Sequence, residues 1–132
     1  MSAIVSLAAD EYPILPDYEE LPPIQPMQQD TADEASKEVL SAMVDLYEYS
    51  GGGSAALLAS DEASEDFLIH FTLLAYYIMR HEKAQAYCAS QPAIVAELRR
   101  YTAYLLGTAG SIYWMLCDFD YCLKTLIGAK SA

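Results

Sequence analysis

Apolar residues recur at helical spacing over three long stretches of this chain, at about residues 31–49, 61–90 and 91–126. In the first stretch a broad apolar stripe follows Thr31 and Glu34, whose capping-box spacing lets the two side chains satisfy each other's backbone N–H groups. Gly51–Gly53 end this stretch, and residues 55–59 predict a short helical turn. The pattern predicts an all-α protein, a compact three- to four-helix antiparallel bundle.

The second stretch predicts a helix that is capped by Ser60 or Asp61 and ends near Tyr87 or Ser90. Four acidic residues fall in its first turns, where the positive end of the helix dipole favours them: Asp61, Glu62, Glu65 and Asp66. The uncharged run over 67–79 is too short to cross a bilayer and has the length of a buried core helix.

The third stretch, opened by Gln91-Pro92 and ending near Leu126, is the one around which we expect the others to pack. Its small residues recur every four positions and predict a helix-packing face, within the chain or across a homodimer formed by the 91–126 helix: Ala103, Gly107 and Ser111. Gly107 and Gly110 indicate a kink, a break into two helices or a close crossing.

Residues 101–117 contain no charged residue, which raises the alternative of a single membrane span. Seventeen residues lie at the lower limit for a span, and Asp118 and Asp120 follow at once. Because the other stretches supply enough amphipathic helix to cover this one, we favour a helix buried in protein over a membrane protein.

Residues 1–30 form a different kind of segment, with five of the six prolines and acidic residues interleaved between them. Proline at this density favours extended backbone over helix. We therefore divide the chain into an extended acidic arm (1–30), a helical bundle (31–127) and a C-terminal tail (128–132). The arm lies either along its own bundle or on a partner, and its candidate contact residues are Tyr12, Ile14, Tyr18, Glu19, Glu20 and Leu21.

The charge of the chain is strongly negative and uneven. The formal net charge is −12, with −14 in residues 1–66 and +2 in residues 67–132. An acidic surface repels nucleic-acid phosphates and anionic lipids, which disfavours direct nucleic-acid binding. It suits a basic protein partner, although solubility alone also explains the charge.

No arrangement of residues predicts catalysis or a cofactor. The glycine run follows no strand and precedes no Lys-Ser/Thr pair, so it is not a phosphate-binding loop. Glu62, Asp66 and His70 share a helix face but lack the Glu-x-x-His pattern of carboxylate metal sites. Three cysteines do not form a disulfide framework, and the N-terminus has no signal-peptide pattern, so we expect reduced thiols and a cytoplasmic protein.

These features predict a small acidic protein that binds a larger basic protein, as an inhibitor, a neutralising protein or a chaperone-like protein, with no metal or cofactor. Blocking a nucleic-acid-binding site on that partner fits the charge. The arm residues above and the acids at 61, 62, 65 and 66 are the predicted partner-binding residues. The alternative is a minor structural subunit of a virion or multisubunit complex, held by its arm.

Overall fold

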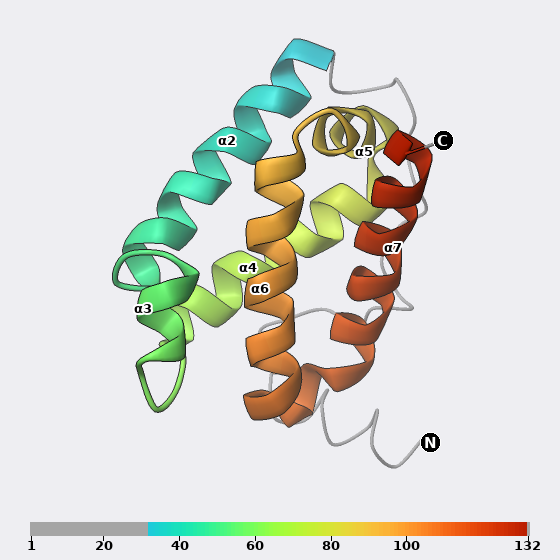
Figure 1. Ribbon diagram of the computed structural model, residues 1–132. Coiled ribbons are helices and arrows are strands. Elements are labelled where there is room, and N and C mark those ends of the chain that lie inside the picture. Colours follow the sequence, from blue (N-terminus) through green and yellow to red (C-terminus); the bar gives the residue numbers. More distant parts are fainter. Residues whose placement is uncertain (1–31, 132) are drawn as a thin grey trace.

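The computed structural model describes residues 32–131, with side chains up to Ile127, and every regular element within that range is helical. The elements are α2 (Ala32–Tyr49), α3 (Ser54–Leu58), α4 (Glu65–Arg80), α5 (Glu82–Ala89), α6 (Pro92–Thr108), the 3-10 turn η2 (Gly110–Ile112) and α7 (Tyr113–Ser131). Figure 1 shows α6 at the centre of the bundle, with α2 on one side and α7 on the other. The all-α prediction is confirmed for these residues. The predicted arm, its six candidate contact residues and Thr31 lie outside them.

The first helix and the short turn after it match the prediction closely. Helix α2 buries Ala35, Val39 and Leu46 on the side that packs against α4 and α5. Gly51, Gly52 and Gly53 all have positive φ angles, which L side chains rarely adopt. The glycine run therefore turns the chain sharply from α2 into α3, and it is a turn, as its sequence context indicates.

The second predicted helix begins later than expected and is divided in two. The N-cap of α4 is Ser64, whose Oγ accepts a hydrogen bond from the Phe67 backbone N–H at 3.1 Å, so Asp61 and Glu62 precede the helix. His81 has extended backbone angles and separates α4 from α5. At this break the Gln85 side-chain amide donates to the Ile78 and Met79 carbonyls, which satisfies groups at the end of α4.

The third predicted helix is also two helices, the second of the three alternatives that Gly107 and Gly110 indicate. Ala109 leaves helical geometry at φ −112° and ψ 67°, and α6 and α7 pack side by side after the reversal (Figure 1). The uncharged stretch 101–117 is thus divided among α6, η2 and α7. No helix within residues 32–131 is long and apolar enough to cross a membrane. Helix α7 continues to Ser131, beyond the end predicted near Leu126 and through most of the predicted tail.

An aromatic cluster fixes the crossing of α4, α6 and α7. The Phe71 ring centroid lies 5.9 Å from that of Phe67, 6.2 Å from that of Tyr101 and 5.6 Å from that of Phe119. All four rings are almost fully buried. Because they come from three helices, they hold α6 in place against α4 and α7.

Candidate interaction surfaces

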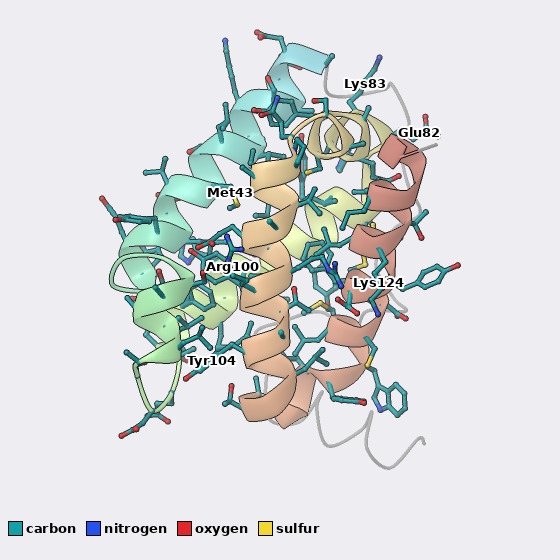
Figure 2. All side chains as sticks on the ribbon, in the orientation of Figure 1. Met43, Glu82, Lys83, Arg100, Tyr104 and Lys124 are labelled. Atoms are coloured by element: carbon teal, nitrogen blue, oxygen red, sulfur yellow. The ribbon has the colours of Figure 1, made fainter. Side chains whose placement is uncertain are left out.

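A groove of about 570 Å³ runs between α2 and α6. One wall is the apolar side of α2, and Met43, labelled in Figure 2, lies between the two helices. The turn Gly52–Ser54 lines the groove, and the other wall carries Glu97 and Tyr101. We call this the α2/α6 groove.

The α2 wall of this groove presents large apolar side chains to solvent. Leu40 is 46% exposed, Val44 60% and Tyr47 59%. These residues are spaced i, i+4 and i+7, so they form one strip on the helix surface, separate from the buried side that packs on α4 and α5. Within the described part of the chain nothing covers this strip, which we call the α2 strip.

Helix α2 carries five carboxylates, of which two lie next to the α2 strip. Asp33, Glu34, Glu38 and Glu48 are exposed and Asp45 is half-buried, against one base, Lys37, which pairs with Asp33 at 3.3 Å. Asp33 and Glu48 flank the strip itself at helical spacing. The α2 strip is therefore bordered by Asp33, Lys37 and Glu48, whereas Glu38 and Asp45 line a pocket against α4.

A hydrogen-bonded network stiffens the α6 wall of the groove. The two Glu97 carboxylate oxygens accept bonds from the Ser54 backbone N–H at 2.7 Å and from its hydroxyl at 2.9 Å. Arg100 donates to Glu97 Oε1 at 2.9 Å from Nη2 and at 3.2 Å from Nε. The network ties α3 to α6 across 43 residues of sequence and so fixes the glycine turn.

The same network sets the charge state of Glu97. Partial burial acts to raise the pKa of its carboxyl, but the hydrogen bonds from Ser54, Arg100 and Tyr101 outweigh burial and hold the pKa below its ordinary value of 4.5. Burial raises the pKa of Tyr101 to about 12, and the nearby Glu97 charge adds to that shift. At neutral pH the groove therefore has a charged carboxylate and a neutral phenol side by side.

The predicted acidic cluster lies on the surface at the junction of α3 and α4. Asp61 and Glu62 are in the connection and Glu65 and Asp66 are in the first turn of α4, all exposed. Asp66 also accepts, through its backbone carbonyl, a 2.8 Å contact from His70 Nδ1. The structure brings these four acids to one end of the molecule without burying them.

The predicted helix-packing residues do not form one continuous face. Ala103 and Gly107 lie on the exposed side of α6, and a Cβ atom at Gly107 would meet nothing within 4 Å. Ser111 belongs to η2, after the break at Ala109. Within the chain α6 packs through larger residues instead: Val95, Leu98, Tyr101, Thr102 and Leu105.

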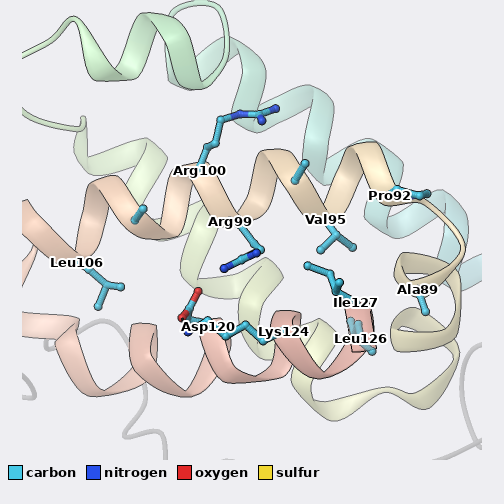
Figure 3. Close-up of a pocket in the computed structure, with 12 residues that line it drawn as sticks. Ala89, Pro92, Val95, Arg99, Arg100, Leu106, Asp120, Lys124, Leu126 and Ile127 are labelled. Atoms are coloured by element: carbon cyan, nitrogen blue, oxygen red, sulfur yellow. Dashed lines mark ion pairs between the residues drawn. The ribbon is translucent and has the colours of Figure 1, made fainter. Parts of the chain in front are cut away.

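A second groove, of about 750 Å³, runs between α6 and α7 and was not predicted from the sequence. Val95, Leu106, Leu126 and Ile127 give it an apolar lining (Figure 3). Arg99 points across it toward α7, whereas Arg100 points to the other side of α6 (Figure 3). Lys124 and Asp120 complete the lining from α7 and pair at 3.0 Å. We call this the α6/α7 groove.

The ionisable side chains of residues 32–131 include no metal-binding cluster, and two of the three cysteine thiols are poorly reactive. Among residues 32–131 no three His, Cys, Asp or Glu side chains lie close enough together to hold a metal ion. Burial raises the pKa of the Cys88 thiol to about 12, with a smaller contribution from nearby Cys122, whose own pKa burial also raises. Both thiols are therefore neutral and poorly nucleophilic at physiological pH.

No protein-family model, curated protein or solved structure matches this chain. What its surfaces bind is therefore inferred below from their own residues.

Proposed function

We propose that this chain is a small acidic interaction protein that binds a larger, basic protein through the α2 strip and the carboxylates around it. The observation that carries the proposal is the exposure of Leu40, Val44 and Tyr47 on a helix that carries five carboxylates and one lysine. Exposed apolar strips with polar rims mark interaction sites, and tyrosine is enriched at interface centres.

The exposed apolar side chains of the α2 strip and the net negative charge of α2 together favour a basic amphipathic helix as the bound element. Leu40, Val44 and Tyr47 would pack against its apolar side, as in other helix-in-groove complexes. Its lysines or arginines would meet the carboxylates that border the strip, such as Glu48. Glu97 on the opposite wall is charged but already pairs with Arg100 at 2.9 Å, so the basic side chains of the partner would meet the α2 carboxylates instead.

The four acids at the junction of α3 and α4 act in the approach of the partner. Exposed charges contribute little to a formed complex but accelerate the encounter of oppositely charged proteins. Changing Glu62, Glu65 and Asp66 to lysine is expected to lower the association rate constant and flatten its dependence on salt. An unchanged association rate would exclude this cluster from the encounter.

The consequence for the partner is that a basic surface is covered. Three forms of action are compatible with covering a basic surface: blocking a nucleic-acid-binding site, neutralising a basic protein and keeping a basic protein soluble. Each is the activity of a binding protein in the cytoplasm, with no reaction, metal or cofactor.

The test is affinity purification from the native host with quantitative mass spectrometry, using wild type, Leu40→Asp/Val44→Asp and Tyr121→Asp. Tyr121 is 74% exposed on α7, so its replacement by aspartate removes an exposed apolar side chain away from the α2 strip. We expect one predominant basic partner with wild type and Tyr121→Asp, lost at least tenfold with the α2 double variant. Equal recovery with all three chains would contradict the proposal.

A further inference from the structure

The α6/α7 groove differs in charge from the rest of this acidic molecule. Arg99 and Lys124 line it, and the N-terminus of α6 at Pro92 adds the positive end of a helix dipole. Asp120, the one acid in its lining, is already paired with Lys124. The groove therefore suits a ligand that is both apolar and negatively charged.

Arg99 is the residue in this groove that is best placed to bind a negatively charged ligand. Its side chain is exposed, points across the groove and forms no ion pair or hydrogen bond with any residue that the structure describes (Figure 3). The other arginine of this turn, Arg100, is occupied by Glu97 and Ser54 on the far side of α6. A carboxylate placed over the apolar lining would thus meet an available guanidinium.

One segment of the chain itself has the matching chemistry. Residues 10–21 contain five acids and no base, and their apolar residues alternate with the acids: Tyr12, Ile14, Leu15, Tyr18 and Leu21. Pro13 and Pro16 reduce the conformational freedom that the segment loses when it binds in extended form.

The length of the chain permits this contact. Helix α2 begins at the end of the bundle where α5 and the start of α6 lie, which is the Ala89 and Pro92 end of the groove (Figure 1). Residues 22–31, fully extended, span about 33 Å. A polyproline-like segment over 10–21 would extend about 37 Å at ~3.1 Å per residue. The α6 side of the groove, from Pro92 to Leu106, rises about 21 Å at ~1.5 Å per residue, so about seven residues of the segment fill it and the others extend beyond its ends.

We infer that the α6/α7 groove binds the chain's own N-terminal segment, residues 10–21, with Arg99 facing its carboxylates. Binding within one chain is favoured over binding to a second copy because a short tether gives an effective concentration in the millimolar range. The arm would then cover the basic groove and leave the α2 strip as the open binding surface. This inference concerns a different groove from the proposed function and does not depend on it.

The experiment is ¹⁵N NMR of the full chain, comparing wild type with Asp17→Lys/Glu19→Lys/Glu20→Lys. These changes lie outside the bundle, so they leave its core resonances in place. We expect the Arg99 Nε and Ala103 backbone resonances to move, and those of Leu40 and Val44 on α2 to stay. The matched control, Asp61→Lys/Glu62→Lys/Asp66→Lys, makes the same change in net charge and is expected to leave Arg99 unmoved.

A second measurement uses cleavage after Glu20 by a glutamate-specific protease. We expect Arg99→Glu to accelerate cleavage roughly tenfold, and Lys83→Glu, on α5 and pointing away from the helices in Figure 2, to leave it unchanged. Arg99 resonances that are the same in wild type and the arm variant would overturn the inference. So would resonance positions in wild type that change on dilution, because these would show binding by a second copy.

Discussion

The two sides of α6 differ in charge and in what they can bind. Glu97 faces α3 and the α2/α6 groove, whereas Arg99, two residues later, points across the α6/α7 groove. Successive residues of a helix are about 100° apart, so positions two apart project to opposite sides. The net charge of −12 therefore does not describe either groove, because the residues that line the α2/α6 groove and the α6/α7 groove differ in charge.

The largest expected effect comes from Phe71→Ala, which would disturb both grooves at once. Phe71 is fully buried where α4 meets α6 and α7. Its removal leaves a cavity, and such changes cost about 3–5 kcal/mol of unfolding free energy. Urea denaturation should show this loss, while Leu73→Ala on the exposed side of α4 should change stability by less than about 1 kcal/mol. Equal effects of the two changes would contradict the placement of α4.

Gly53→Ala should damage the α2/α6 groove alone. Gly53 has a φ of +96°, and an added Cβ would lie 3.2 Å from Glu97 Oε2 and 3.4 Å from the Tyr47 ring. The strained backbone and the close contacts predict a loss of about 1–3 kcal/mol, measurable by thermal denaturation. A variant as stable as wild type would show that the glycine turn is not held as described.

Glu97→Gln tests the network on the same side, with a signature in its pH dependence. Because the pKa of Glu97 is lower in the folded chain than its ordinary 4.5, the carboxylate stabilises the fold above that pH. The stabilisation is lost as the pH falls through the folded-state pKa. We expect a destabilisation of about 1–3 kcal/mol at pH 7 that shrinks below pH ~4.5. Glu48→Gln, at an exposed position on α2, serves as the control. A difference in unfolding free energy between Glu97→Gln and wild type that does not vary with pH would contradict the network.

Gly107→Ala is expected to stabilise the protein slightly. The added methyl group meets nothing within 4 Å, and alanine is favoured over glycine in a helix by about 0.5–1 kcal/mol. Denaturation at several protein concentrations measures the change. A loss of stability that grows with protein concentration would instead show that a second copy packs closely on α6 at this position.

Cys88 provides the smallest and most local test. With its pKa raised to about 12 by burial, its thiol should resist alkylation in the native protein and react only on unfolding. Mass spectrometry after brief iodoacetamide treatment should find Cys117, which is half-buried, modified first. Early modification of Cys88 would contradict its place in the core.

Local signals in the sequence predicted the helical class, α2, α3 and the start of α6 at Pro92. The breaks at His81 and Ala109 were harder to place because neither residue is a strong helix breaker. The first break is supported by the Gln85 side chain, which belongs to the following helix. The cap of α4 is Ser64, where the sequence predicted Ser60 or Asp61, because Asp61 and Glu62 belong to the connection that precedes the helix.

The surfaces were less predictable than the helices. The spacing of Ala103 and Gly107 correctly places both residues on one side of α6. The sequence does not show that this side is exposed in the described part of the chain. The apolar strip of α2 adjoins the buried face of the helix at helical spacing. The sequence alone therefore does not separate its exposed apolar residues from the core residues. The bases of the second half of the chain indicated a less acidic region, but the meeting of Arg99 with Lys124 depends on the reversal at Ala109.

The most direct test of the central proposal is hydrogen–deuterium exchange of the full chain with and without the basic partner recovered from the native host. The account predicts slower exchange on binding in residues 32–49, with residues 113–127 unchanged. Protection confined to α7, or none in α2, would contradict it.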